Sequence, residues 1–297
     1  MNFTSSERDY IEENEAYVPI SESEKRRVRS TETLFALMKS AGTEAVGTEE
    51  TKSDTATVGI ETAKSNALAV AATTVESGLP DMRHCIFSDL DLRGRDMRGL
   101  DLSRSTFENC DLRGTDFSGS KMDNVAFYNN KLMGMKLCGC KARGCSFRFQ
   151  DMTDIDLRGA NIYASVLEDA INQDKVIVDD ETEWYRMRCP EEGEAFVAWK
   201  CCTDLRVVMM LVPRDAKRCM ATMETGRAER VKVLKITNID ETENFTWAQS
   251  TVDPDFYYEV GKWLEPANGF QEDRWKDSSP GIHFFLDRQQ CVDYQSK

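Results

Sequence analysis

Large apolar residues recur at every fifth position between Phe87 and Leu167. Such a period fits neither the 3.6-residue repeat of an amphipathic helix nor the two-residue alternation of an ordinary strand. A short fixed period instead indicates identical units that stack on one another. The seventeen apolar positions are Phe87, Leu92, Met97, Leu102, Phe107, Leu112, Phe117, Met122, Phe127, Leu132, Leu137, Ala142, Phe147, Met152, Leu157, Ile162 and Leu167.

Each unit also has a regular pattern around its apolar centre. The residue two positions before the centre is often small, the residue before it is often Asp, and the residue two positions after it is often Gly. The stretch Cys110-Asp-Leu-Arg-Gly114 is a near-consensus unit. Over residues 85–169 this pattern resembles the pentapeptide-repeat family. The resemblance implies a right-handed, four-sided parallel β-helix with five residues on each side.

Four sides require a second period of twenty residues, and the sequence contains it. Every fourth centre carries a similar residue. The third of the four corners in each group is closed by Gly. The two clearest columns are Phe87, Phe107, Phe127 and Phe147, and Gly99, Gly119, Gly139 and Gly159. The period of twenty is independent of the period of five. We therefore expect a short rod over residues 81–170, with the Phe column as its structural spine.

Cysteines in the repeat occupy mostly the small inward position. Four of the five are placed in this way: Cys85, Cys110, Cys140 and Cys145. Neither a Cys-x-x-Cys pair nor a nearby His completes a metal site. We expect packed thiols and no metal.

The charge of the repeat bears on one function that the resemblance suggests, because some pentapeptide-repeat proteins mimic DNA with an acidic rod. Residues 85–169 hold 13 acidic and 12 basic residues, net −1. Lys131 and Lys136 interrupt the two outward Asp columns, which predicts a ladder of Lys–Asp pairs between coils. This balance disfavours a DNA-mimic inhibitor of a DNA-binding enzyme, which stays as an alternative.

Residues 1–80 form an acidic N-terminal arm with two helical patterns. The first runs over residues 21–42, with Ser30 or Thr31 as its cap, and the second over residues 60–77. In the first, Leu34, Phe35 and Met38 form an apolar face too narrow to fold alone. We expect this face to cover a partner or the rest of the chain. The alternative is a flexible acidic arm with two marginal helices.

Residues 171–297 have a different pattern, which predicts a globular α+β or mostly-β domain. Strand-like runs cover 195–200, 205–212, 231–237, 256–264 and 282–286, and a short helix is expected from Asp287 to Tyr294. The stretches 213–230 and 238–255 are predicted to be exposed polar loops. All five Trp of the chain lie in this segment. We therefore expect some aromatic residues to form a recognition patch.

This segment also resembles the uncharacterised domain that often follows pentapeptide repeats in bacterial, phage and large-virus proteins. The matching stretches include Asp273-Arg-Trp275 and Ser279-Pro-Gly-Ile-His-Phe-Phe285. The resemblance implies no known activity. The combination of Asp273, Arg274 and Trp275 is common both at recognition sites and at structural corners.

His283 is one of two histidines and lies within an apolar strand. It is either a base or binding residue, or a half-buried structural histidine. Residues 281–294 faintly resemble the strand and helix of ADP-ribosyltransferase-like folds, without the upstream motif or the catalytic Glu. A divergent enzyme domain is therefore an alternative. The candidate partner-binding residues are Asp273, Arg274, Trp275, His283, Leu34, Phe35 and Met38.

Composition narrows the function further. The 297-residue chain has a formal net charge of −14, which disfavours binding to nucleic acid or to an anionic membrane. No apolar run is long enough for a membrane helix, and no secretory signal is visible. We expect an intracellular, cytoplasmic protein that needs no cofactor. The favoured interpretation is a non-enzymatic interaction or scaffold protein, which binds a protein partner and belongs to a larger assembly.

Overall fold

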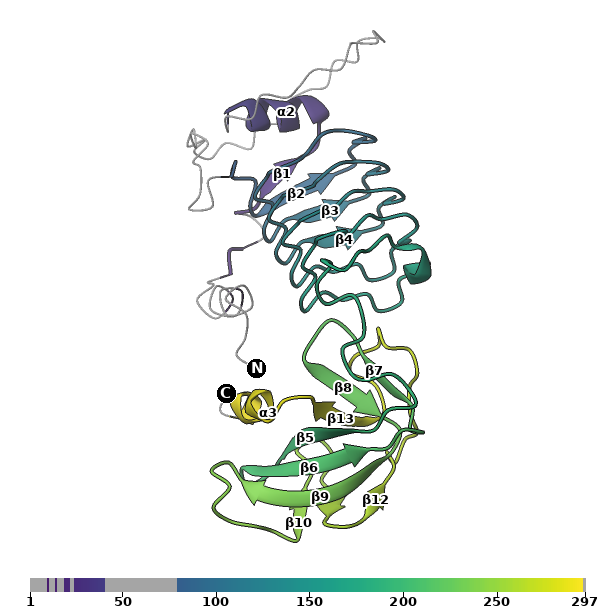
Figure 1. Ribbon diagram of the computed structural model, residues 1–297. Helices are drawn as coiled ribbons and strands as arrows, with labels where there is room; N and C mark the ends of the chain where they lie inside the picture. Colours follow the sequence, from purple (N-terminus) through teal and green to yellow (C-terminus); the bar gives the residue numbers. More distant parts are fainter. Residues whose placement is uncertain (1–9, 11–13, 15–18, 22–23, 41–78, 296–297) are drawn as a thin grey trace.

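The structure is a computed structural model that describes residues 10, 14, 19–21, 24–40 and 79–295. It is mainly β and consists of a rod of stacked coils followed by a second β domain at one end of the rod (Figure 1). The helix predicted over residues 60–77 lies outside the described residues.

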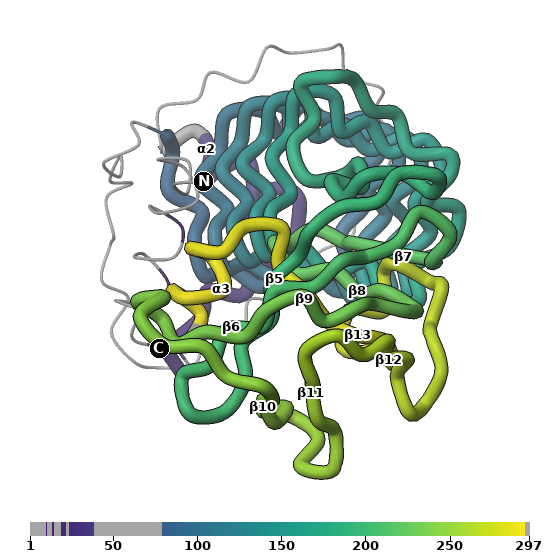
Figure 2. Tube along the Cα trace, turned by 60° about the horizontal axis from the view of Figure 1, so that its bottom comes forward, coloured from purple at the N-terminus to yellow at the C-terminus, as the bar shows by residue number. Residues whose placement is uncertain are grey.

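Parallel pairing builds the rod. Strands β2 (Cys85–Ser88), β3 (Thr106–Glu108) and β4 (Ala126–Tyr128) pair in sequence, with Phe87 opposite Phe107 and Phe107 opposite Phe127. On the other sides of the coil, bridges join residues that are also twenty positions apart, such as Asp91 and Asp111. The predicted period of twenty residues is thus confirmed. Figure 2 shows the resulting coils lying side by side.

The interior of the rod is filled by the repeat centres. All seventeen predicted apolar positions are buried. The rings of the Phe column stack with centroids 4.6, 5.5 and 5.1 Å apart. The small residues two positions before the centres form hydrogen bonds to the neighbouring coil. For example, the Thr115 hydroxyl donates to the Leu92 carbonyl at 2.7 Å. The Cys140 thiol donates in the same way to the Phe117 carbonyl at 3.0 Å, and burial raises the pKa of this thiol to about 12.

The charges on the rod are arranged differently from the prediction. Close ion pairs join several of the outward Asp residues to the Arg two residues later, as in Arg93 Nη2 to Asp91 Oδ2 at 2.6 Å and Arg113 Nη2 to Asp111 Oδ2 at 2.6 Å. Lys131 does lie opposite Asp111 in the next coil and helps to lower the pKa of Asp111, but the Arg113 side chain has the larger effect. An Arg two residues after the Asp lies in the same coil and reaches its carboxylate more easily than a Lys in the next coil does. The local Asp–Arg pair therefore replaces the predicted Lys–Asp ladder.

The N-terminal end of the rod is covered by the arm. Strand β1 (Arg26–Val28) pairs in parallel with β2, and helix α2 (Thr31–Ser40) follows. The Ser30 hydroxyl accepts a hydrogen bond from the Thr33 N–H at 3.1 Å, so Ser30 is the cap. The helix predicted within residues 21–42 therefore begins at Thr31, and Arg26–Val28 form a strand instead. The first coil would otherwise expose an unpaired strand edge, which β1 satisfies.

A second part of the arm contacts the side of the rod. The Tyr10 hydroxyl donates to Asn124 Oδ1 at 2.8 Å, and the guanidinium of Arg143 lies 4.9 Å from the Tyr10 ring centroid. Arg143 is itself buried in an ion pair with Asp123. Gly144 leaves the space for Tyr10, because a Cβ at this position would clash with the hydroxyl.

The C-terminal domain is built on an antiparallel sheet. In the described part of the chain its seven strands have the order β12-β9-β6-β5-β13-β8-β7. Their bounds are β5 Phe196–Cys202, β6 Arg206–Val212, β7 Arg218–Met220, β8 Thr225–Ala228, β9 Val231–Asn238, β12 Trp263–Leu264 and β13 Ile282–Phe285. A separate hairpin consists of β10 (Trp247–Gln249) and β11 (Tyr257–Glu259), and helix α3 (Arg288–Gln295) follows β13. Four of the five predicted strand runs and the final helix are confirmed, whereas the run predicted over residues 256–264 is divided into β11 and β12, which belong to different sheets.

The prediction of an exposed loop over residues 213–230 is wrong. This stretch contains β7 and β8, and both Arg218 and Arg227 are buried. Their charges are satisfied by backbone carbonyls. The Arg218 guanidinium donates to Glu194 O at 2.6 Å, and that of Arg227 donates to Asp277 O at 2.8 Å.

Candidate functional site

The junction between the rod and the C-terminal domain contains three of the predicted partner-binding residues. Arg274 donates hydrogen bonds to Met220 O at 2.8 Å and to Tyr185 O at 2.6 Å. Trp275 packs against the end of the rod core, with its ring 5.4 Å from that of Tyr185. Asp273 accepts a hydrogen bond from the Trp275 N–H at 3.1 Å, which holds the corner. These contacts of Asp273, Arg274 and Trp275 join the C-terminal domain to the end of the rod within one chain.

The other predicted residues are far from this junction. Leu34 and Met38 are buried against the rod core at its N-terminal end, and Phe35 packs beside them under the guanidinium of Arg95. His283 lies on β13 and lines a cavity in the C-terminal domain. The structure therefore brings Asp273, Arg274 and Trp275 together and separates them from the rest. A partner-binding role for each of these residues stays a prediction.

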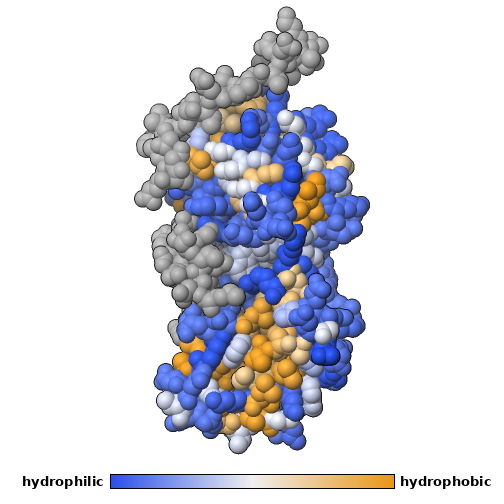
Figure 3. Space-filling view, in the orientation of Figure 1, coloured by the Kyte–Doolittle hydropathy of each residue, from blue (hydrophilic) through white to orange (hydrophobic). Residues whose placement is uncertain are grey.

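One face of the C-terminal sheet is apolar and open, and we call it the open sheet face. In β5 and β6, Ala198 and Met210 point into the domain core, so their neighbours along the strands point to the opposite face. Cross-strand pairing continues this face across β9 to Trp263 on β12, which is 50% exposed. The open sheet face consists of Val197, Trp199, Met209, Leu211 and Trp263. Figure 3 shows a continuous hydrophobic area over β5, β6 and β9.

Two lysines of β9 lie within the open sheet face, and a helix covers one end of the same side of the sheet. Lys232 pairs with Leu211 and its amine lies 5.7 Å from the Trp263 ring centroid. Lys235 pairs with Met209 and is exposed. Helix α3 covers the end of the sheet near Cys201, where Cys291 packs against that residue. Elsewhere on the face Val197, Met209 and Leu211 are half-buried and Trp263 is exposed, while Trp199 packs against the cluster beneath helix α3.

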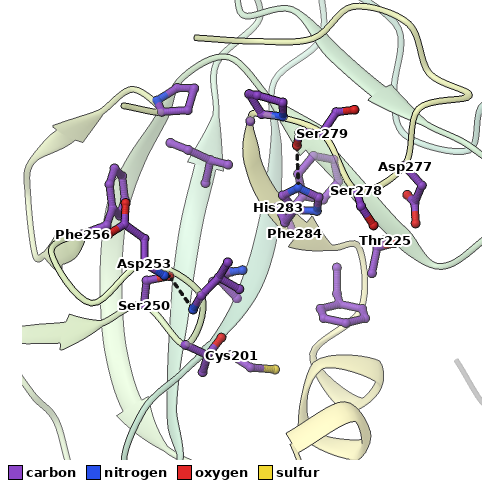
Figure 4. A pocket seen from close by; sticks show the side chains of 18 of the residues that line it. Cys201, Thr225, Ser250, Asp253, Phe256, Asp277, Ser278, Ser279, His283 and Phe284 are labelled. Carbon is purple, nitrogen blue, oxygen red and sulfur yellow. Dashed lines mark hydrogen bonds between the residues drawn. The ribbon is translucent and has the colours of Figure 1, made fainter. Parts of the chain in front are cut away.

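A cavity of about 510 Å³ opens where two neighbouring strands diverge. In the described chain, β13 pairs with β5 through one residue pair, Phe285 and Trp199. Beyond Trp199, β5 turns toward the β10–β11 hairpin, where Cys202 bridges Ser250. Figure 4 shows Ser250, Asp253 and Phe256 on one side of the cavity and His283 and Phe284 on the other.

The cavity contains two basic side chains with shifted pKa values. The His283 Nε2 lies 3.0 Å from the Ser279 carbonyl, and burial lowers the pKa of His283. Lys200 lies on β5 and also lines the cavity, and burial lowers its pKa as well. The sequence analysis missed Lys200. The signal was present in the alternation of Ala198, Lys200 and Cys202, which places a lysine in the core-facing register of an apolar strand.

The C-terminal end of the chain also places two thiols together beside the cavity. Cys201 Sγ and Cys291 Sγ lie 2.7 Å apart, and both side chains are buried. The hydrogen bond between these thiols lowers the pKa of Cys201. Among the described residues, no group of three or more His, Cys, Asp or Glu side chains is arranged to hold a metal ion.

Comparison with known proteins assigns both regions. Residues 80–157 match a family model described as the pentapeptide repeat region. The rod is a pentapeptide repeat region. Residues 185–291, which include the open sheet face and the cavity, match a family of unknown function (DUF5758). No curated protein matches the chain.

Two solved structures illustrate the likeness of the pentapeptide repeat region. One is a pentapeptide repeat protein (Rfr23) from the cyanobacterium Cyanothece 51142, with 13% identity, a TM-score of 0.23, and coverage of 34% of this chain and 85% of that chain. The other is QnrB1, a plasmid-mediated fluoroquinolone resistance protein, with 14% identity, a TM-score of 0.13, and coverage of 34% and 78%. As for the membrane, no helix among the described residues combines the length and the apolar character that a crossing needs.

Proposed function

We propose that this chain is a non-enzymatic interaction protein whose C-terminal domain binds a protein partner. The observation that carries the proposal is the open sheet face, because its apolar residues on the neighbouring strands β5 and β6 and the exposed Trp263 form more apolar surface than a monomer usually leaves open to water. Trp199 and Trp263 are large side chains of the type that dominate binding energy in protein interfaces. The pentapeptide repeat region then serves as a rigid spacer within a larger assembly.

Charge favours a different protein over a second copy of this chain. The net charge of −14 makes two copies repel each other. Lys232 and Lys235 add positive charge within the open sheet face, which is complementary to acidic side chains on a partner. The partner we propose therefore presents apolar side chains with acidic residues around them, and we place the interaction inside the cell.

We also infer that the pentapeptide repeat region is a right-handed, four-sided parallel β-helix. The register of twenty residues and the buried repeat centres support this geometry. Helix α2 covers one end of the stack, and Trp275 packs at the other. Covered ends support the role of a spacer, because repeat rods need capping to stay soluble.

The two alternatives have weaker support. A DNA mimic needs free outward carboxylates, whereas Asp91, Asp96 and Asp111 each bind a neighbouring Arg. An enzyme is favoured by the cavity and by the lowered pKa of His283. However, the described hydrogen bonds place a backbone carbonyl at His283, where an acid–base catalyst is usually oriented by a carboxylate.

The test is substitution within the open sheet face. Met209→Glu places a charge on this face, and Met133→Glu introduces the same change at an exposed position of the pentapeptide repeat region. Both tagged variants and the wild-type chain are used to capture proteins from the native source after mild cross-linking. We expect the specific partner to be lost about tenfold or more with Met209→Glu and retained with Met133→Glu.

The contrary result is equally clear. If both variants capture the same proteins as the wild-type chain, the open sheet face is not the binding surface. Capture by residues 81–170 alone would place the partner on the pentapeptide repeat region.

A further inference from the structure

Lys200 occupies an unusual position for a charged residue. It lies on β5 between Ala198 and Cys202, and both of these neighbours are buried in the domain core. Its cross-strand neighbour on β6 is Val208, which is fully buried. The lysine therefore starts from the core side of the sheet, and its side chain ends at the cavity where β5 and β13 diverge.

The charge of Lys200 has no counterion in the described part of the chain. Among the described residues, no carboxylate is one of the groups that act on this charge. The groups that act on its charge are the thiols of Cys202, Cys201 and Cys291, and burial lowers its pKa. A buried ammonium group is costly unless it is paired, so this position is suited to an anion that enters from outside.

The walls of the cavity restrict what this anion can be. Phe256, Tyr258, Ile282 and Phe284 line it with apolar surface. Its volume falls within the range of about 300–1,000 Å³ that is typical of small-ligand sites. Asp253 and Asp277 also line the cavity, and their carboxyl groups disfavour a ligand with more than one negative charge.

We propose that the cavity binds an apolar monocarboxylate, with the carboxylate at Lys200 and the apolar part between Phe256 and Phe284. The same chemistry is present in a free aliphatic or aromatic acid and in the C-terminal carboxylate of a peptide that ends in an apolar residue. This site is separate from the open sheet face and does not depend on it.

The experiment measures binding to the full chain by isothermal titration calorimetry. The probes are 3-phenylpropionate and its neutral amide, 3-phenylpropionamide. We expect the carboxylate to bind at least about tenfold more tightly than the amide, because a charge-assisted hydrogen bond to Lys200 is lost in the amide. Lys200→Met should remove this preference. Lys235→Met, which changes an exposed lysine of the same domain, should preserve it.

A second pair of probes identifies the source of the carboxylate. N-acetyl-alanyl-phenylalanine carries a free C-terminal carboxylate, and its C-terminal amide is the control. Tighter binding of the dipeptide acid than of phenylpropionate favours a peptide ligand, and the reverse order favours a free acid. The proposal is overturned if acid and amide bind the wild-type chain equally, or if neither acid binds. This comparison needs no variant, so it holds even if Lys200→Met fails to fold.

Discussion

The pentapeptide repeat region and the C-terminal domain are stabilised by contacts of different range along the chain. In the repeat region parallel pairs join residues twenty positions apart from coil to coil, until the spacing lengthens at the last coil, where Asp156 bridges Ile177 and Asn161 bridges Glu183. In the C-terminal domain β13 (Ile282–Phe285) lies between β5 and β8, which precede it by more than fifty residues. The first region is therefore stable through repetition of one local rule, and the second depends on single contacts that occur once.

The largest expected effect tests this rule in the repeat region. Phe127→Ala removes a ring that stacks between Phe107 and Phe147 and leaves a cavity in the spine. We expect the free energy of unfolding to fall by about 3–5 kcal/mol, as measured by chemical denaturation. The control is Tyr128→Ala at the next residue, which is 57% exposed and should cost less than about 1 kcal/mol. Equal effects of the two changes would contradict the spine.

A smaller effect is expected at the junction between the two regions. Arg274→Met leaves the carbonyls of Met220 and Tyr185 without their donor. We expect a loss of about 2 kcal/mol and an earlier unfolding transition for the C-terminal domain. Arg186→Met is the matched control, because Arg186 forms an exposed ion pair with Asp180. If the control destabilises the chain as strongly, the junction does not depend on Arg274.

The smallest effect concerns Lys200, whose charge burial disfavours in the free chain. Lys200→Met should raise stability by on the order of 1 kcal/mol at neutral pH, since it removes a buried charge. Burial lowers the pKa of Lys200 in the folded chain below its ordinary value of 10.5. At pH values between the lowered pKa and 10.5, the unfolded chain therefore binds more protons than the folded chain.

The pH dependence provides the check on this prediction. Wild-type stability should rise with pH across the window between the lowered pKa and 10.5, relative to the variant. Denaturation of both chains over this range measures the difference. Parallel stability profiles would show that Lys200 is not charged at a cost in the folded chain.

The same contrast in range explains how much of the fold could be predicted. The buried centres and the register of twenty residues follow from residue types at fixed spacing, so Phe87 to Leu167 were found without knowledge of any partner strand. Strand β1 was missed because its residues, Arg26 to Val28, form a strand only where β2 offers an edge. Strands β7 and β8 were not predicted because the stretch that contains Arg218 and Arg227 has the polar composition of an exposed loop. Their burial depends on carbonyls distant in sequence.

The candidate site was harder to predict than the fold. The sequence analysis singled out His283, which does line the cavity, but the cavity exists because β5 and β13 separate beyond Trp199. No local pattern reports that separation. Lys200 was visible as a lysine in the core-facing register of β5. Its role depends on the cavity beside it and on which charged groups of the described chain lie near its amine, and both are set by segments distant in the sequence.

The spacing of twenty residues between neighbouring coils means that each coil adds the same length to the rod. One additional coil of twenty residues would add about 4.8 Å to the distance between helix α2 and the C-terminal domain, because neighbouring strands lie that far apart. The ends that α2 and Trp275 cover would be unchanged by such an insertion. Length can therefore change in equal steps while both attachment points keep their structure. In the role of a spacer that we propose, the number of coils would set the distance between helix α2 and the C-terminal domain.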